Sequence, residues 1–410
     1  MRIAIFTDNF FPELGGIQDS IAATARELGA RGHAVAIFAP TAVRRDFERA
    51  NLPRAELDLG ENVRIHRQFS VAIPGSTGQS RLIVPMPTHA RAVAAFGPHV
   101  IHAHTFLGAG MEALAAARRL DLPLIGTNHW AVSGFGLYAP PVAREACARA
   151  AWRAVARFYN NCSWVSAPSL VTLAEMRVYG LRRPGSVVSN PIDTGLFRPP
   201  SPGERERLKQ LWDLPSPSIL YAGRLAREKC VEVLIRALPA LRRDIPGATL
   251  VLAGHGTAEP ELRALAQAEG LAGAVRFTGT LSQPRLAELC RAVDAFAIAS
   301  TSESQSMMLL QAMSAGLPAV AARHGPLPEL FSGGAGLLAQ PDDPADFAKQ
   351  LVRLLADRDL RERTAAHARR SSAGFGVCTT TTVWQTIYQR AIRGAWCPAP
   401  VRAVSSESCA

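Results

Sequence analysis

The chain has 410 residues, of which 48% are apolar and 19% are charged. This composition is typical of a globular protein with large cores and excludes a largely disordered one. At roughly 150 residues per domain, the length indicates two to three domains. No run of 18 or more apolar residues occurs, so we expect no membrane-spanning helix.

The charge balance is basic. Lys and Arg together number 45 against 34 Asp and Glu, a formal net charge of +11, and all but three of the basic residues are arginine. A basic protein can bind nucleic acid, an anionic membrane surface or phosphorylated substrates. The sequence lacks a basic–aromatic recognition motif, so we expect no nucleic-acid partner.

The cysteine pattern and the first residues bear on the compartment. The seven cysteines are scattered, odd in number and without a Cys-x-x-Cys pair, which disfavours a disulfide framework or a structural zinc site. The opening MRIAIFTDNFFPELGG is typical of a strand and a loop, without the apolar core of a secretion signal. We therefore expect a cytoplasmic protein.

Strand-like apolar runs alternate with helix-like stretches along the chain. In the first half the strands are expected at 2–6, 34–38, 98–104 and 122–127, with helices at 20–32 and 111–119. The pattern begins again after residues 193–206, which are rich in Pro, Gly and charge. The strands there are expected at 218–223, 248–254, 274–279, 295–300, 317–322 and 336–340, with helices at 231–244 and 344–359.

This alternation predicts an α/β fold in which two parallel sheets carry helices on both faces. We place the domains at 1–194 and 195–374, followed by a helix at 375–393 and a disordered tail at 394–410. Parallel sheets of this kind bind ligands beyond the carboxyl ends of their strands, and clefts between domains are favoured sites. The loops that follow strands are therefore the candidate functional segments.

One such loop carries Gly223, Arg224 and Lys229. Glycine lets a ligand approach the backbone, and Arg224 is expected at the carboxyl edge of the sheet. Lys229 is expected in the first turn of the next helix, where a cation is unfavourable unless an anion shares the site. The pair suits a diphosphate, although two ordinary surface cations explain the pattern equally well.

A second loop begins at Glu303, after the strand expected at 295–300. Ser304 or Ser306 can cap the following helix, whose free N–H groups can hold phosphate oxygens. Gln311 lies within that helix, and with Glu303 it could bind hydroxyls on either side of a diphosphate. The structural alternative is a carboxylate that complements the helix dipole and a neutral surface amide.

An ordered set of segments runs through the chain. Those in the second half are NPID (190–193), GRLAREK (223–229), LVLAGHG (250–256), VRFTG (275–279) and SESQSMMLLQAMSAGLPAVA (302–321). Those in the first half are FTDNFFPELGGI (6–17), HAVAIFAP (33–40), VIHAHT (100–105), GTNH (126–129) and APS (167–169). Taken together, this set resembles retaining glycosyltransferases of family 4, which have the GT-B fold. GTNHW (126–130) and SESQSMMLLQAM (302–313) are similar to the subset of that family that acts on diacylglycerol and related lipids. The resemblance implies two Rossmann-like domains facing across a cleft, with the acceptor on the first domain, the nucleotide sugar on the second, and the helix at 375–393 packed back on the first.

The resemblance also implies roles for single residues. Arg224 and Lys229 match the cationic pair that neutralises the leaving diphosphate, and Glu303 matches the carboxylate that holds sugar hydroxyls. Gln311 replaces the family's second Glu, the usual ribose ligand, so the charged bidentate contact is lost. His129 matches the histidine that faces the sugar and the reaction centre; its alternative is a buried histidine with a satisfied partner.

The remaining donor contacts come from glycine loops and a helix start. The resemblance implies that the donor lies against Gly15, Gly16, Gly223, Gly254, Gly256, Thr278, Ser304, Gln305, Ser306, Met307 and Gln311. His102 and His104 straddle a strand, so one of them is expected to face the core. Trp384 and Tyr388, four residues apart, are expected to pack as structural residues.

The mechanism follows from the residue types. No Asp-x-Asp occurs near these motifs and the Asp and His residues lack ligand spacing, so we expect no metal and no other cofactor. Cations and helix N–H groups would stabilise the departing diphosphate instead. No carboxylate pair suited to double displacement is evident. The resemblance to retaining transferases implies instead that the departing phosphate helps to deprotonate the acceptor.

The acceptor is expected to be a lipid, with a soluble secondary metabolite or a polysaccharide precursor as alternatives. Residues 141–161 carry Arg144, Arg149, Arg153 and Arg157 with Trp152 and Phe158 nearby. Such a helix can lie on an anionic membrane surface, at the inner face of the membrane in this case, or be an ordinary solvated helix. Residues 73–87 could form an acceptor-facing loop.

Two other classes stay open. A GT-B sugar-nucleotide epimerase would need acid and base carboxylates, which the motifs lack. A nucleotide-binding protein without turnover is favoured only by Gln311, and an assay of donor hydrolysis or transfer would separate it from an enzyme.

Overall fold

The computed structural model describes residues 1–13, 15–50, 52–73, 81–131 and 141–394. The chain divides into two compact units: unit 1 comprises Met1–Pro191 with the last segment from Val377, and unit 2 comprises Ile192–Gly376. The expected tail at 394–410 lies outside the described residues, apart from Gly394. None of the described helices combines the length and apolarity that crossing a bilayer requires.

Unit 1 is built on a parallel sheet of seven strands in the order β3-β2-β1-β6-β7-β8-β9. The strands are β1 (Arg2–Phe6), β2 (Ala34–Pro40), β3 (Val63–Gln68), β6 (Val100–Ala103), β7 (Leu124–Thr127), β8 (Trp164–Ala167) and β9 (Gly185–Val187). A separate antiparallel pair is formed by β4 (Ser70–Ala72) and β5 (Arg81–Ile83). The expected loop at 73–87 therefore includes a strand, and residues 74–80 lie outside the described part.

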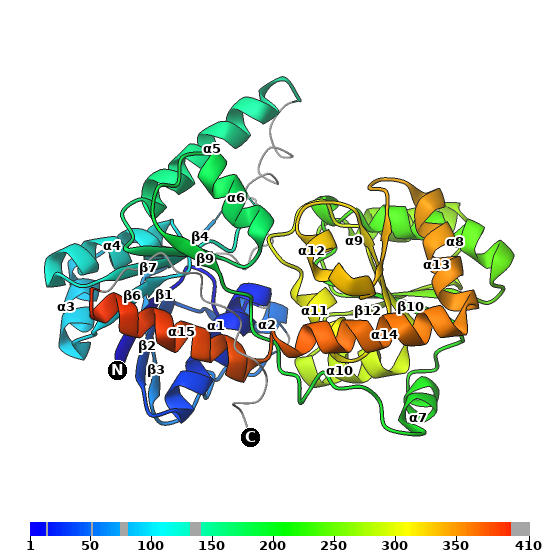
Figure 1. Ribbon diagram of the computed structural model, residues 1–410, viewed down its shortest axis with the longest axis horizontal. Coiled ribbons are helices and arrows are strands. Elements are labelled where there is room, and N and C mark those ends of the chain that lie inside the picture. Colours follow the sequence, from blue (N-terminus) through cyan, green and yellow to red (C-terminus); the bar gives the residue numbers. More distant parts are fainter. Residues whose placement is uncertain (14, 51, 74–80, 132–140, 395–410) are drawn as a thin grey trace. The chain divides into compact units, whose positions relative to one another are not determined.

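Helices cover both faces of this sheet (Figure 1). The helices are α1 (Gly16–Ala30), α2 (Arg44–Ala50), α3 (Pro87–Phe96), α4 (Gly108–Leu120), α5 (Arg144–Tyr159), α6 (Leu170–Val178) and α15 (Val377–Ile392). Apolar residues of α1 and α15 form one core with the sheet, and those of α3 to α6 form another on the opposite face. Trp384 and Tyr388 are buried in the first of these cores. Cys378, at the start of α15, is disulfide-bonded, although the scattered cysteines disfavoured a disulfide framework.

Unit 2 repeats the architecture with a parallel sheet of six strands in the order β12-β11-β10-β13-β14-β15. The strands are β10 (Ser218–Ala222), β11 (Thr249–Ala253), β12 (Val275–Gly279), β13 (Ala295–Ile298), β14 (Ala319–Ala322) and β15 (Leu337–Ala339). Nearly every residue of the four central strands is buried, which explains why they read as continuous apolar runs.

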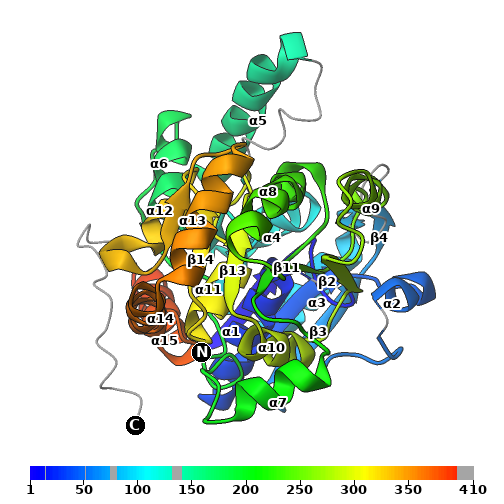
Figure 2. The same cartoon turned by 90° about the vertical axis from the view of Figure 1, so that its right-hand side faces the viewer.

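The helices of unit 2 lie on both faces of its sheet (Figures 1 and 2). They are α7 (Glu204–Leu211), α8 (Val231–Asp244), α9 (Glu259–Ala268), α10 (Gln283–Ala292), α11 (Met307–Ser314), α12 (Leu327–Leu330), α13 (Pro344–Ala356) and α14 (Arg358–Ala373). In both units the strand order reverses beside the first strand, which is the doubly wound Rossmann-like arrangement. The predicted fold class is therefore confirmed.

Candidate functional site

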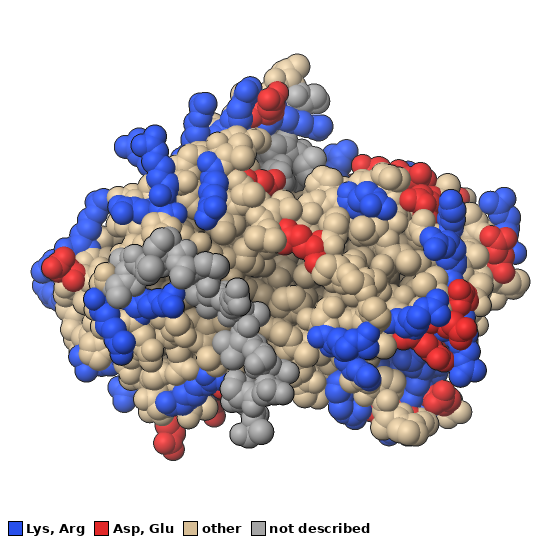
Figure 3. All heavy atoms as spheres, viewed as in Figure 1, with Lys and Arg blue, Asp and Glu red and all other residues tan. Residues whose placement is uncertain are grey.

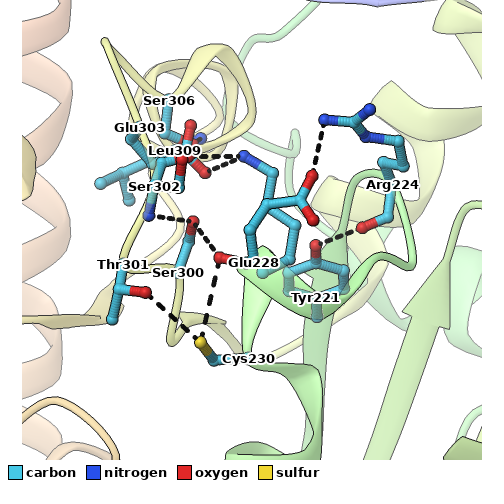
Figure 4. A network of polar contacts seen from close by, with 11 residues as sticks. Tyr221, Arg224, Glu228, Cys230, Ser300, Thr301, Ser302, Glu303, Ser306 and Leu309 are labelled. Atoms are coloured by element: carbon cyan, nitrogen blue, oxygen red, sulfur yellow. Dashed lines mark hydrogen bonds and ion pairs between the residues drawn. The ribbon is translucent and has the colours of Figure 1, made fainter. Parts of the chain in front are cut away.

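The strand order of unit 2 reverses between β10 and β13. Ligands of doubly wound sheets bind beyond the carboxyl ends of the strands at such a reversal. The loop after β10 carries Arg224 and Lys229, and the loop after β13 carries Glu303. The sheet therefore brings these three predicted residues to one edge: Figure 4 shows Arg224 and Glu303 there, and Lys229 contacts Glu303.

Lys229 and Glu303 form an ion pair in which Nζ lies 2.7 Å from Oε1. The ammonium also donates to the carbonyl oxygen of Ser302 at 3.0 Å. Only 15% of the Lys229 side chain and 12% of the Glu303 side chain are exposed. Lys229 ends a 3₁₀ turn, Arg227–Lys229, and Cys230 in the left-handed region separates it from α8. The prediction that Lys229 lies in the first turn of the α-helix is therefore wrong by about one turn.

Arg224 is half exposed and pairs with Glu228, whose Oε1 lies 2.9 Å from the guanidinium. The hydroxyl of Tyr221 donates to the Arg224 carbonyl oxygen at 2.9 Å and holds the loop in place. Glu228 was missed by the sequence reasoning, although its i,i+4 spacing from Arg224 was a usable signal. Each of the two predicted cations thus has a carboxylate partner, and the four charges sum to zero.

Glycines allow the loops after β10, β11 and β12 to stack backbone against backbone. Gly223 and Gly254 have φ values of 146° and 141°, which L side chains rarely adopt. A Cβ on Gly254 would collide with the carbonyl oxygen of Gly223, and one on Gly256 with that of Leu225. Gly254 N–H donates to the carbonyl of Gly279, 2.8 Å away, at the end of β12. These contacts require glycine whether or not a ligand is bound.

Thr278 lies in β12 and donates its hydroxyl to the Gly279 carbonyl oxygen at 3.1 Å. It is partly exposed, and it precedes the residue to which Gly254 is bonded. Thr278 thus lies beside the glycine loops of the same sheet edge.

The start of α11 is capped by Ser306, whose Oγ accepts the Leu309 N–H at 3.2 Å. The capping residue is therefore Ser306 and not Ser304. Gln305 is buried beside it. Helical geometry leaves the N–H groups of Met307 and Met308 without a partner inside the helix, and this is the arrangement that binds phosphate oxygens.

Gln311 is buried in α11, and its Nε2 donates to Oε1 of Gln283, the first residue of α10, at 3.1 Å. Its own Oε1 has no hydrogen-bond partner within the described part of the chain. The alternative interpretation of Gln311 as a neutral surface amide is therefore wrong. One acceptor oxygen of Gln311 is left over for a hydroxyl group.

Gly15, Gly16 and His129 belong to unit 1. Gly15 is the N-cap residue of α1 and Gly16 its first residue, just after β1. His129 follows β7 and is buried, with Nε2 2.8 Å from Nδ1 of His104. Burial lowers the pKa of His129 to about 4, although a hydrogen bond to the Asn190 side chain raises it, so the imidazole is neutral near pH 7. Its role toward a sugar stays a prediction.

His102 and His104 do not straddle β6, because residues two apart on a strand share a face. Their rings lie 4.0 Å apart and both are buried. His102 Nδ1 lies 2.8 Å from the Tyr388 hydroxyl of α15, and Nε2 lies 2.7 Å from Oγ1 of Thr127. Burial lowers the pKa of His102 to about 3. The neutral imidazole therefore links α15 to the sheet.

The basic helix of the sequence corresponds to α5 and the turn before it. Arg144, Arg149, Arg153 and Arg157 are exposed, and Figure 3 shows arginines gathered over α5. Trp152 and Phe158, however, are buried in the core of unit 1, so the expected aromatic contribution is wrong. The exposed apolar residues nearby in the chain are Val142, Leu170 and Val178.

The described residues contain no grouping of three or more His, Cys, Asp and Glu side chains that could hold a metal ion.

Two family models match the two halves of the chain. The model "Glycosyltransferase Family 4" matches residues 14–196, and "Glycosyl transferases group 1" matches residues 203–371. The chain is 33% identical over 311 residues to glycogen synthase of Mycobacterium tuberculosis, which covers 74% of this chain and 71% of that protein. It is 26% identical over 379 residues to alpha-monoglucosyldiacylglycerol synthase of Streptococcus pneumoniae, covering 89% and 80% respectively.

The crystal structure of HepE from Anabaena in complex with UDP-glucose superposes with a TM-score of 0.74 at 20% identity, covering 95% of this chain and all of that one. The two doubly wound sheets thus define the GT-B class of enzymes. The chain belongs to glycosyltransferase family 4 and uses a nucleotide sugar as its donor.

Proposed function

We propose that the enzyme moves a hexose from a uridine diphosphate sugar to an acceptor hydroxyl with retention of anomeric configuration. The observation that carries this proposal is the convergence of Arg224, Lys229 and Glu303 at the strand-order reversal of unit 2. The UDP-glucose held by the similarly folded HepE supports uridine as the base.

In this proposal Arg224 and Lys229 bind the diphosphate and stabilise the charge that develops as the C1–O bond breaks. The first N–H groups of α11 bind the same phosphates. Glu303 accepts hydrogen bonds from sugar hydroxyls, Gln311 accepts one from the ribose, and His129 faces the sugar. As the acceptor oxygen bonds to C1, its proton passes to an oxygen of the departing diphosphate. These two cations supply the charge compensation that a divalent ion supplies elsewhere, so transfer requires no metal.

We further propose that the acceptor is a lipid reached at the inner face of the membrane. Exposed arginines of α5, together with Val142, Leu170 and Val178, offer the mixture of charge and apolar surface that binds anionic lipid. The name of the streptococcal relative, alpha-monoglucosyldiacylglycerol synthase, supports a lipid acceptor. A soluble metabolite or a polysaccharide precursor is the alternative acceptor.

The proposal is tested with Arg224→Ala, assayed for sugar transfer from UDP-glucose in the presence of EDTA. Loss of a group that stabilises transition-state charge should lower kcat/KM about 100-fold. The matched control is Arg227→Ala, which removes an exposed arginine from the same loop and should stay within about threefold of the parent. Proton NMR of the product reports the anomeric configuration.

An Arg224→Ala variant with nearly unchanged turnover would contradict the site assignment. An inverted product would contradict the retaining mechanism, and strict dependence on a divalent ion would contradict the charge argument. Donor binding without transfer or hydrolysis would favour a non-catalytic protein, and conversion of the sugar on its nucleotide would favour an epimerase.

A further inference from the structure

Gln68, the last residue of β3, is only 2% exposed, yet neither its amide nitrogen nor its amide oxygen has a hydrogen-bond partner in the described part of the chain. An unpaired buried polar group costs about 1–3 kcal/mol. Folded proteins therefore pair nearly all such groups, and the exceptions call for an explanation such as a bound water or a ligand. Gln68 stands at the carboxyl edge of the first sheet, where α/β proteins bind their ligands.

Two further polar atoms at this edge of the unit 1 sheet share this property. Oδ1 of Asn9 and Oε2 of Glu112 are buried and without a hydrogen-bond partner among the described residues. Asn9 follows β1, and Glu112, 7% exposed, lies near the start of α4, just after β6. Because β1, β3 and β6 run parallel in one sheet, all three groups lie at the same edge.

A chain of contacts connects these residues. Ser70, two residues beyond Gln68, pairs with Ile83 of β5. The Ile83 amide donates to Asp8 at 2.9 Å, and Asp8 precedes Asn9. The charge of Asp8 in turn raises the pKa of Glu112, although burial of Glu112 is the larger cause. These contacts connect the neighbourhood of each of the three unpaired groups to Asp8.

The region around Asp8 is held in shape from several sides. Asp8 accepts the Ala109 amide at the start of α4 and, at 2.7 Å, the hydroxyl of Thr105. Oε1 of Glu112 accepts the Met86 amide at 3.1 Å and lies 2.5 Å from Nδ1 of His89. With this oxygen engaged, the second oxygen of Glu112 has a fixed direction. A preorganised group of this kind binds without the entropy cost of ordering it.

The chemistry of the three groups selects their ligand. An amide donates and accepts, while the asparagine and glutamate oxygens accept. Asp8 and Glu112 disfavour an anion, and the nearby Arg67 and Arg81 have Glu56 and Asp46 as partners. An apolar group would leave all the polar atoms unpaired. A ligand with several adjacent hydroxyl groups, each of which donates and accepts a hydrogen bond, can pair with all the unpaired atoms of Asn9, Gln68 and Glu112.

We propose that Asn9, Gln68 and Glu112 bind the hydroxyl-rich head of the acceptor, a sugar or polyol group either free or attached to a lipid. This inference rests on the proposed function and specifies its acceptor. It expects an acceptor with several hydroxyls to be used in preference to one with a single hydroxyl.

The test is transfer from UDP-glucose and GDP-mannose to maltose, to n-octyl β-D-glucoside in vesicles and to dioctanoylglycerol. Gln68→Leu should raise the KM of whichever saccharide probe is used about tenfold or more, with kcat and the donor KM within about threefold, because only an acceptor contact is lost. The variant should melt no lower than the parent, since an unpaired amide is removed. Asn9→Ser should raise the same KM.

The control is Gln350→Leu, a buried glutamine of α13 whose amide bonds to Asp346 and Arg353. It should lower the melting temperature and leave the acceptor KM unchanged. A Gln68→Leu enzyme with an unchanged acceptor KM would overturn the inference, since the amide is then merely buried or water-bound. Transfer to dioctanoylglycerol alone would also overturn the inference about the acceptor site, but it would leave the proposed transferase function intact. Failure to bind either UDP-glucose or GDP-mannose would overturn both the inference and the proposed function. Comparison of transfer to maltose with transfer to octyl glucoside shows whether the acceptor is a free saccharide or the saccharide head group of a lipid.

Discussion

Nζ of Lys229 lies 2.7 Å from Oε1 of Glu303, although the two residues are 74 positions apart in the chain. The pair exists because β10 and β13 are neighbours in the sheet and each is followed by one of the two residues. A diphosphate that binds Lys229 must compete with this carboxylate. Binding of the diphosphate and release of Glu303 toward sugar hydroxyls are therefore expected to be coupled.

Glu303→Gln should bind free UDP about three to tenfold more tightly than the parent while losing most of its transferase activity. The amide holds the ammonium less strongly than a carboxylate does, so Lys229 is more available to the diphosphate. The activity falls because the sugar loses its charged hydrogen-bond acceptor. Isothermal titration calorimetry with UDP and a transfer assay measure the two effects.

Glu362→Gln is the control for this change, because Glu362 pairs with Arg358 on the exposed surface of α14. Its UDP affinity should equal that of the parent. If Glu303→Gln bound UDP more weakly than the parent, the competition between the carboxylate and the diphosphate would be refuted.

Gly254→Ala should destabilise unit 2 by about 2 kcal/mol or more and abolish tight UDP binding. Its φ of 141° is unfavourable for alanine, and the new Cβ would meet the carbonyl oxygen of Gly223. Gly270→Ala is the control, since Gly270 has a φ of 69° but open space around its Cβ, and should cost only about 1 kcal/mol. Urea unfolding of both variants checks the difference; equal losses would argue against the close packing of the loops.

Unit 1 should lose stability as the pH falls from about 6.5 to about 4. His102 and His129 have pKa values lowered to about 3 and about 4 from an ordinary value of 6.5. In this window the unfolded chain takes up protons that the folded chain does not, so unfolding becomes more favourable; above pH 6.5 the effect vanishes. For His102 alone the loss is roughly 3 kcal/mol by pH 4.

The measurement is the urea midpoint at several pH values for the parent and for His102→Gln, which should show a flatter dependence. His324→Gln, at an exposed position of unit 2, should retain the full dependence of the parent. A parent protein with the same midpoint at pH 6.5 and pH 4 would mean that these imidazoles already carry protons in the folded state.

Replacing Arg153 and Arg157 of α5 by alanine should weaken binding to phosphatidylglycerol vesicles about tenfold or more. Each basic side chain near an anionic surface contributes about 1 kcal/mol, and high salt should remove the contribution. Arg369→Ala with Arg370→Ala on α14 changes the net charge equally and should leave binding unchanged. Sedimentation with anionic and with phosphatidylcholine vesicles measures this binding. An equal loss of binding to anionic vesicles in the two double variants would point to nonspecific charge attraction.

The central strands could be predicted from the sequence because burial on both faces produces uninterrupted apolar runs. Strand β3, with the sequence VRIHRQ, was not predicted from the sequence, because it is an edge strand with partly exposed residues and mixed polarity. Helix α8 matches its expected bounds, since its apolar residues recur with helical spacing. Trp152 and Phe158 were misassigned because helical spacing shows that a helix has an apolar face, and only the neighbouring elements decide whether that face is covered.

The order of strands and helices, the family motifs and the candidate residues Arg224, Lys229 and Glu303 were readable from the sequence by itself, because burial and chain turning leave local patterns. Only the tertiary structure decided which carboxylate pairs with which cation. It alone also decided that Gln68, Asn9 and Glu112, at one edge of the sheet, each carry a buried atom without a hydrogen-bond partner among the described residues. Contacts between residues far apart in the chain depend on strand order and register, and no local pattern records these.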